Sequence, residues 1–383
     1  MRCIISDFSK RTEKPNEDET KGFANNYLQN TDFLLLIFKE EKMKYGINIA
    51  HENLLRERVP ELKFDETADY AAWKEKVREK FFELLGDMPE RVVLEAKVEF
   101  ERECEEYVER RIIFRAERDC LVPCHLLIPK KGKAPYPTLI CLQGHSSGMH
   151  ISLGRMQTPR DEMFTHGDED YAMQALKLGY AVIALEQRSF GERRCDPRIL
   201  DKDVTCAHDA MVALLLGRTM IGCRAFDVSR TVDLIEEIPE LDSDRIALMG
   251  LSGGGTATYY AAAFEPRIKA AMPAGAVCSF DGSIGTIHHC SCNYIPGIAK
   301  YFDMGEIAAL IAPRPLVVVT GSKDDIFLLD GVRRVDEVIT KIYEKENAVD
   351  KHKLIVGDGG HRFYAADSWD SFTALFPVNA DGK

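Results

Sequence analysis

One short run of residues has the composition and spacing of a nucleophilic serine site. Gly250-Leu251-Ser252-Gly253-Gly254 fits the pattern G-x-S-x-G. A strand-like run, RIALM, comes directly before it, and a helix-like run, TATYYAAAF, follows it. This strand–turn–helix setting is what a nucleophile elbow requires, because glycines allow a tight turn that lifts the serine hydroxyl clear of the sheet. We therefore predict Ser252 as a nucleophile. The alternative, a glycine-rich phosphate-binding turn, lacks both a G-x-x-x-x-G-K-[ST] run and a strand–G-x-G-x-x-G–helix unit.

A serine hydroxyl needs a base within hydrogen-bonding reach, and that base needs an orienting carboxylate. At elbow-type sites the acid and then the histidine follow the serine along the chain. His361 lies in the loop GDGGHRF, directly after the strand-like run KLIVG. Open α/β sheets bind ligands at the carboxyl ends of their strands, so we expect His361 to be the base. The other histidines after the elbow lie at a strand entry or in an irregular segment: His352, His288 and His289.

Two neighbouring aspartates are candidates for the orienting acid. Asp324 and Asp325 follow the apolar run Leu316–Thr320, which is typical of a buried strand. Their spacing from the serine and the histidine suits the role equally well. Aspartates that follow Gly-Ser-Lys are also common in exposed turns, and we expect one of the two to be of that kind. Spacing alone leaves the choice open.

An oxyanion hole needs two backbone N–H groups aimed at the oxygen that becomes negatively charged. One should belong to Gly253, the residue after the nucleophile, and the other to the loop after the first strand of the parallel series. That loop is Gln143–Gly148, and we expect the His145 N–H to be the second donor. The His145 imidazole would line the pocket, and the alternative for this loop is a plain glycine-rich turn.

The elements around these residues alternate in type along the chain. Residues 65–86 predict an amphipathic helix, and three strand-like runs from Val92 predict an antiparallel meander. Strands at 137–142, 181–185, 245–249, 268–272, 316–320 and 353–356 then alternate with helices at 168–178, 207–238 (with a break near Gly222) and 253–264. Such alternation predicts an α/β fold: a mostly parallel central sheet with helices on both faces, preceded by an N-terminal helical and antiparallel-strand addition.

The segment 274–313 departs from this rhythm. It has no long helical pattern and contains glycine, proline and the run HHCSCNYIPG. Extended irregular segments in compact domains are often functional, so we expect an insert that lines or caps the pocket. His288, His289, Cys290 and Cys292 are potential metal ligands within it. Structural zinc sites use two ligand pairs separated along the chain, and no second cysteine pair with that spacing is present, so we expect packing, no metal and no cofactor.

Composition restricts the class of protein. The chain has 383 residues, 45% of them hydrophobic, and 50 Lys+Arg against 62 Asp+Glu give a formal charge of −12. These proportions are typical of a soluble globular protein, and the acidic balance argues against binding to nucleic acids or anionic lipid. The early apolar run Phe33–Phe38 is far too short for a membrane span. Eleven cysteines without a signal peptide indicate a reducing cytoplasm rather than a secreted disulfide framework.

The sequence as a whole resembles a known family. From about residue 65 to about residue 370 it is similar to α/β-hydrolase esterases of the acetyl xylan esterase and cephalosporin-C deacetylase type. The resemblance implies an α/β-hydrolase fold and a triad of Ser252, Asp324 and His361, because relatives place the acid at the position of Asp324. The chain departs from better-characterised deacetylases at Gln143-Gly144, where they have His-Gly, and at Gly253, where they have Gln. The resemblance is carried by several runs together: QGHSSGMHISLGR, EQRSFGER, GRTMIGCRAFDVSRTVDLI, GLSGGGT, CNYIPGI, IAALIAPRPL, GSKDDIF and GGHRF.

These observations predict a serine hydrolase that acts on small carboxylic esters, acetyl groups on a carbohydrate above all. A prolyl-oligopeptidase-like peptidase, an amide or carbon–carbon hydrolase, and a non-catalytic binding protein of the same fold are the alternatives. We expect an N-terminal extension over residues 1–64 and a hydrolase domain over 65–376, with Met43 as an alternative start. A homo-oligomer is left open. Arg188 is expected to tether neighbouring loops, and Asp227, Arg230 and Asp233 to form an ion-pair network on one helix face.

Overall fold

The computed structural model describes residues 47–165, 167–195 and 202–379. The described residues fall into two units, a short one that contains residues 47–53 and a larger one from residue 54 to residue 379. Helix α2 (Ile47–Glu57) spans the boundary between them. The apolar run at 33–38 and the alternative start at Met43 lie outside the described residues, and the predicted domain limits and cytoplasmic location stay predictions. No described helix combines the length and apolarity that crossing a membrane would need.

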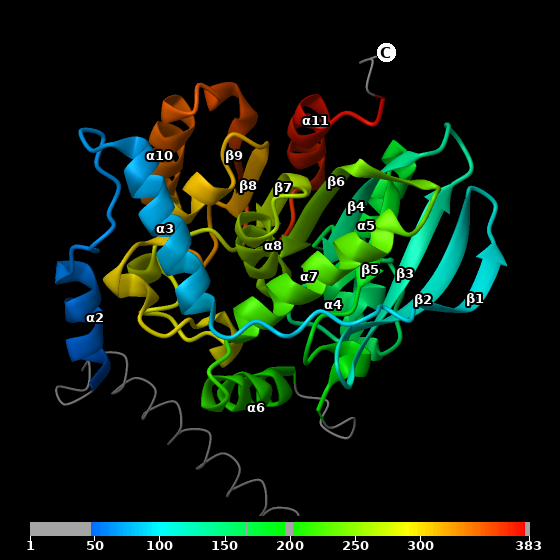
Figure 1. The fold of residues 1–383 in the computed structure, drawn as a ribbon, viewed down its shortest axis with the longest axis horizontal. Coiled ribbons are helices and arrows are strands. Elements are labelled where there is room, and N and C mark those ends of the chain that lie inside the picture. The colour runs from blue at the N-terminus through cyan, green and yellow to red at the C-terminus, as the bar shows by residue number, and fades with distance from the viewer. Residues whose placement is uncertain (1–46, 166, 196–201, 380–383) are drawn as a thin grey trace, which may run out of the picture. The chain divides into compact units, whose positions relative to one another are not determined.

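The larger unit is built on one mixed sheet of nine strands in the order β1-β2-β3-β5-β4-β6-β7-β8-β9 (Figure 1). Pairing is antiparallel from β1 to β5 along this order, and parallel from β5 to β9. The predicted meander and the mostly parallel sheet are therefore confirmed. The strands are β1 (Lys97–Glu103), β2 (Tyr107–Glu117), β3 (Cys120–Pro129), β4 (Tyr136–Leu142), β5 (Ala181–Leu185), β6 (Leu241–Leu251), β7 (Ile268–Ala274), β8 (Leu316–Gly321) and β9 (His352–Gly357).

Alternate side chains of the central strands enter two separate hydrophobic cores. In β4, Ile140 and Leu142 pack in the core that includes helices α3, α7, α8 and α10, whereas Leu139 and Cys141 pack in the core with α5 and α11. Successive side chains of a strand point to opposite faces, so a strand covered on both sides must be apolar throughout. The helices are α3 (Tyr70–Leu85), α4 (Glu162–Thr165), α5 (Tyr171–Leu178), α6 (Lys202–Leu215), α7 (Met220–Glu236), α8 (Gly253–Phe264), α9 (Met304–Ile307), α10 (Leu329–Lys345) and α11 (Ala365–Leu375).

The predicted long helical region 207–238 is two helices, and its break lies earlier than expected. Helix α6 ends at Leu215, and Thr219 caps α7 by accepting the N–H of Gly222. Gly222 therefore lies inside the first turn of α7. A Cβ at this position would come within 2.5 Å of the carbonyl oxygen of Leu85, so glycine serves a close approach to α3 rather than a helix break.

The segment 274–313 contains only short helical turns, as predicted. Its single α-helix, α9, has four residues, and the rest are 3₁₀ turns and loops. Helices α10 and α11 were not predicted from the sequence. Both pack an apolar face on the sheet, with Val335 and Ile339 of α10 in one core and Phe372 of α11 in the other.

Candidate active site

Ser252 occupies a strained turn between β6 and α8. Its φ and ψ are 56° and −121°, a backbone conformation that residues other than glycine rarely adopt. The Ser252 N–H donates to the carbonyl oxygen of Ala274 at 2.9 Å. Cβ atoms at Gly250 and Gly254 would overlap the backbone of β4 at the Leu142 carbonyl oxygen. The two outer glycines of the motif are therefore required by the close approach of this turn to the neighbouring strand.

His361 and Asp324 meet at the carboxyl ends of the last two strands. His361 Nδ1 lies 2.7 Å from Asp324 Oδ2. The other oxygen of Asp324 accepts the backbone N–H groups of Ile326 and Phe327, each at 3.0 Å. These contacts fix the buried carboxylate, whereas Asp325 is exposed. Of the two aspartates left open by spacing, the structure brings Asp324 to the histidine.

The His361 ring is held by packing contacts, and the residue lines a cavity. The ring stacks on Phe327 with centroids 5.6 Å apart and an angle of 17° between the planes. On its other side it approaches Gly275, where a Cβ would lie 2.8 Å from Cε1. Within the described residues the buried Nε2 has no hydrogen-bond partner. Because Nδ1–H donates to the carboxylate, Nε2 is the nitrogen that can accept a proton.

A cavity of about 350 Å³ brings the predicted residues together. Ser252 and His361 both line it, with the loop after β4 on one side and the segment 274–313 on another. Four residues of this segment line the cavity: His288, His289, Cys290 and Asn293. The lining residues are Gly144, His145, Met163, Phe164, Glu169, Leu251, Ser252, Gly253, His288, His289, Cys290, Asn293, Ile326, Phe327 and His361.

The two predicted oxyanion donors border this cavity beside the serine. A Cβ at Gly144 would lie 3.3 Å from the Cβ of Ser252, so the loop after β4 passes directly along the nucleophile. The His145 ring lies against Gly253, where a Cβ would be 2.7 Å from Nδ1. A larger residue than glycine after the nucleophile would collide with the histidine ring in the facing loop. The role of the two amides as donors stays a prediction.

Glu186, just beyond the end of β5, is a buried acid that the sequence analysis did not single out. Its Oε1 accepts the side-chain N–H of Gln143 at 2.6 Å and the backbone N–H of Met149 at 3.1 Å. Burial raises the pKa of Glu186 to about 7, against the opposing effect of the backbone N–H groups that donate to it. Glu186 thereby fixes both ends of the loop that carries His145. Its place in the run EQRSFGER was visible, but its contact with this loop was not.

The arginine network beneath the loops is partly as predicted. Arg188 donates to both carboxylate oxygens of Asp227, at 2.8 and 2.7 Å, and pairs with Glu117 at 2.6 Å. Arg188 thus tethers its own loop, but to helix α7 and the end of β2 rather than to neighbouring loops. Arg230 pairs with Asp233 on the same helix, but Asp227 pairs with Arg188 and not with Arg230. The expected network along one helix face is therefore wrong for Asp227, which is buried and turned toward the loop after β5.

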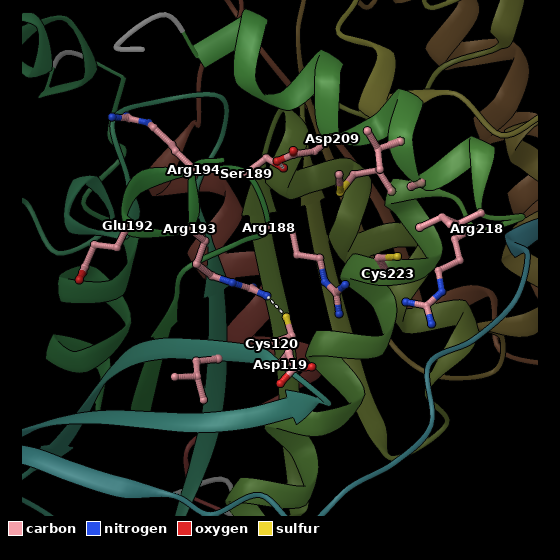
Figure 2. Close-up of a pocket in the computed structure, with 15 residues that line it drawn as sticks. Asp119, Cys120, Arg188, Ser189, Glu192, Arg193, Arg194, Asp209, Arg218 and Cys223 are labelled. Carbon is pink, nitrogen blue, oxygen red and sulfur yellow. Dashed lines mark hydrogen bonds between the residues drawn. The ribbon is translucent and has the colours of Figure 1, made fainter. Parts of the chain in front are cut away.

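Figure 2 shows a second cavity, of about 440 Å³, which shares no lining residue with the first. Four arginines line it, and three of them already have carboxylate partners: Arg188 and Arg193 with Asp227, and Arg218 with Glu117. Arg193 also donates to the sulfur of Cys120, as the dashed line marks. Because three of the four arginines are held in ion pairs within the chain and neither Ser252 nor His361 lines this cavity, the first cavity is the candidate active site.

The sheet order, the elbow after β6, and the histidine and acid after β9 and β8 define an α/β-hydrolase fold. The chain belongs to the Abhydrolase family known as Abhydrolase_7, whose model matches residues 43–355. The fold class predicted from the sequence is thereby confirmed.

Three similar proteins illustrate the relationship. "Putative hydrolase YtaP" of Bacillus subtilis (strain 168) is 26% identical over 289 residues, which cover 74% of this chain and 92% of that protein. A solved structure described as a putative acetyl xylan esterase from Bacteroides fragilis NCTC 9343 has a TM-score of 0.69 at 16% identity, covering 89% of this chain and 92% of that one. A glucuronoyl esterase from Solibacter usitatus has a TM-score of 0.64 at 16% identity, covering 84% and 97%.

Replacement of Glu186 by Gln should change the pH dependence of stability. Folded Glu186 keeps its proton up to about pH 7, whereas the ordinary value is 4.5, so unfolding between these values releases a proton. The contribution of Glu186 to the free energy of unfolding should therefore be fully present below about pH 4.5 and lost as the pH rises to about 7, by up to about 3 kcal/mol. Urea unfolding of wild type and Glu186→Gln across this range measures the difference.

The exposed neighbour Glu192 supplies the matched substitution, Glu192→Gln. The difference in the free energy of unfolding between wild type and Glu186→Gln should change with pH. If it does not, or if Glu192→Gln gives the same pH-dependent difference, Glu186 is not a buried acid with a raised pKa.

Proposed function

We propose that this protein is a serine hydrolase of small carboxylic esters, and that acetyl groups on a carbohydrate are its substrates. The observation that carries the proposal is the shared cavity in which a strained serine and a carboxylate-bound histidine both present their side chains. A nucleophile and a base that line one cavity, with an acid bound to the far nitrogen of the base, are the parts that acyl transfer through serine requires.

In the proposed reaction, the Ser252 hydroxyl attacks the acyl carbon while His361 Nε2 takes its proton. Asp324 holds the proton on Nδ1 and stabilises the imidazolium that forms. The carbonyl oxygen becomes an oxyanion, which the amides of Gly253 and His145 bind. The tetrahedral species collapses, the bond from the acyl carbon to the alcohol oxygen breaks, and His361 returns the proton to the leaving alcohol.

The acyl-enzyme is then cleared by water through the same groups. Water attacks the acyl carbon of the Ser252 ester while His361 removes a proton from it. The second oxyanion is bound by the same two amide N–H groups. When the ester bond breaks, His361 protonates the serine oxygen and the carboxylic acid is released. The scheme balances without a cofactor.

The acetyl assignment rests on the sequence resemblance and on the fold shared with a protein described as a putative acetyl xylan esterase. A second candidate is a methyl or alkyl ester of a glucuronate, in which the sugar is the acyl group. The likeness to structures described as glucuronoyl esterases favours it. The two substrates place the sugar on opposite sides of the scissile bond, so they make different demands on the same cavity.

The alternatives named from the sequence are weaker. A prolyl-oligopeptidase-like peptidase normally has a large β-propeller, whereas the described residues before β4 form α2, α3 and the three strands β1–β3. An amide or carbon–carbon hydrolase would use the same nucleophile and stays an outcome of substrate tests. A non-catalytic binding protein would have no reason to keep His361 aligned on Asp324 beside a strained serine.

The adjacent aspartates provide a matched test of the proposed acid. Asp324→Asn should lower kcat for a chromogenic acetyl ester by about 10⁴, because the amide favours the wrong histidine tautomer, and Ser252→Ala should lower it at least as much. Asp325→Asn should stay within about threefold of wild type, because that carboxylate is exposed. Equal losses for the two aspartate variants, or undiminished hydrolysis by Ser252→Ala, would contradict the proposed site.

A substrate panel separates the two sugar esters. We expect wild type to release acetate from acetylated xylo-oligosaccharides and to prefer acetyl over butyryl and longer chromogenic esters, because the carbohydrate lies on the alcohol side. The methyl ester of glucuronate should be cleaved at a much lower kcat/KM. Faster cleavage of the glucuronate ester would replace the acetyl assignment with the second candidate. A preference for long acyl chains, with no release of acetate from sugars, would overturn both.

A further inference from the structure

Four side chains with metal-binding atoms gather beside the candidate active site. They are His145, Cys206, Cys290 and Cys292, and their ligand atoms all lie within 4.8 Å of one another. Two of these atoms, His145 Nε2 and Cys292 Sγ, lie 3.2 Å apart. The four come from three separate segments: the loop after β4, helix α6, and the pocket-lining segment 274–313.

The chemistry and spacing of this set match a closed zinc site. Three thiolates and one imidazole in a tetrahedron are a common structural zinc set. With zinc–sulfur bonds of about 2.3 Å, the sulfurs of such a tetrahedron lie about 3.8 Å apart. Ligand atoms within 4.8 Å of one another therefore need only small side-chain rotations to reach this geometry, and they leave room for one ion rather than a cluster.

Charge around the group supplies an independent reason for a metal–thiolate centre. Arg224 is 1% exposed and donates to the sulfurs of Cys292 at 3.4 Å and Cys206 at 3.2 Å. Its other contacts are the carbonyl oxygen of Arg188 and the ring of Phe190, and the ion pairs of the described residues include none with Arg224. A buried guanidinium needs a compensating negative charge.

A zinc ion with three thiolates and a neutral imidazole carries a net charge of −1, which offsets the single positive charge of Arg224. N–H donors to ligand sulfurs are also the usual outer contacts of such centres. The remaining surroundings are apolar, since Phe190, Ala210 and Met220 pack with the buried cysteines. Neutral thiols in the same place would leave the guanidinium without a counter-charge.

We propose that His145, Cys206, Cys290 and Cys292 form a structural zinc site. All four tetrahedral positions are filled by the chain, so the ion has no open position for substrate and acts by holding segments together. It ties α6 and the segment 274–313 to the loop after β4. The proposal goes beyond the esterase assignment and does not depend on it.

A zinc ion at this place differs from the expectation of no metal that the sequence alone supports. A zinc site was expected to need a second cysteine pair close together in the sequence. In the structure, the Cys290-x-Cys292 pair is instead joined by two single residues far away in the chain, His145 and Cys206. His288 and His289, which are potential ligands by residue type, are not members of the set. His289 Nε2 instead lies 3.1 Å from the Ser283 hydroxyl and 3.2 Å from the carbonyl oxygen of Ile326.

Zinc at this place is compatible with the proposed oxyanion hole. The imidazole would bind through Nε2, the nitrogen nearest to Cys292, while Nδ1 remains on the side of Gly253. Only the ring of His145 is used, so its backbone amide stays available to the cavity. The ion would therefore set the position of one oxyanion donor without contacting the substrate.

The zinc content of the purified protein tests the proposal directly. Full-length protein purified without chelators from zinc-replete medium should contain about one zinc ion per chain by elemental analysis. The variants Cys206→Ser and Cys292→Ser should lose most of this zinc. Cys223→Ser is the matched control, because Cys223 is also buried and adjoins Arg224 in the sequence but lies outside the set; it should keep the metal.

Cobalt binding gives a readout that does not depend on how the variants fold. Metal-stripped wild type titrated with Co²⁺ should develop the thiolate-to-cobalt charge-transfer absorption and the strong visible bands of tetrahedral cobalt, saturating at about one ion per chain. Wild type that contains no zinc and gives no such bands would overturn the proposal. So would a disulfide between Cys206 and Cys290 or Cys292 found by peptide mapping, or zinc retained in a Cys206→Ser/Cys292→Ser double variant.

Discussion

The site depends on the close approach of one turn to one neighbouring strand. Ser252 has a positive φ, a conformation that costs on the order of 1–3 kcal/mol for a residue with a side chain and persists only where its surroundings enforce it. The enforcement comes from the parallel pairing of β4 and β6, which brings Gly250 and Gly254 against the carbonyl oxygen of Leu142. With glycine at both positions the turn can sit this close to the sheet, and the serine side chain is directed away from it into the cavity.

The rest of the site follows from strand direction. Because β4, β6, β8 and β9 run parallel, the residues that follow them emerge at one edge of the sheet, although they are far apart in the chain. The loop after β4 is then fixed from both sides: Glu186 accepts N–H groups at its two ends, and the cysteine set with His145 joins it to α6 and to the segment 274–313. The cavity wall is thus connected to elements that carry no reacting group.

Features encoded in a short stretch of sequence were predictable, and those made by contacts between distant segments were not. The elbow at Ser252 and the meander were visible as local patterns, and chain order singled out His361. Spacing could not choose between Asp324 and its neighbour, because the difference is one of burial and of backbone donors that only the folded loop supplies. Glu186 and the cysteine set were missed for the same reason: their partners lie in other segments. The predicted helix break was misplaced because glycine at position 222 is required by the close approach of the Leu85 carbonyl oxygen and does not interrupt its own helix.

The central claim is that an acyl group passes through Ser252. Mass spectrometry of wild-type protein, acid-quenched during turnover of an acetyl ester and digested, tests it most directly. Acyl transfer through Ser252 should leave an acetyl group on the peptide that contains Ser252, and this group should disappear once the substrate is exhausted. Steady hydrolysis with no acetyl on that peptide, or with acetyl on another residue that forms and decays at the rate of turnover, would contradict it.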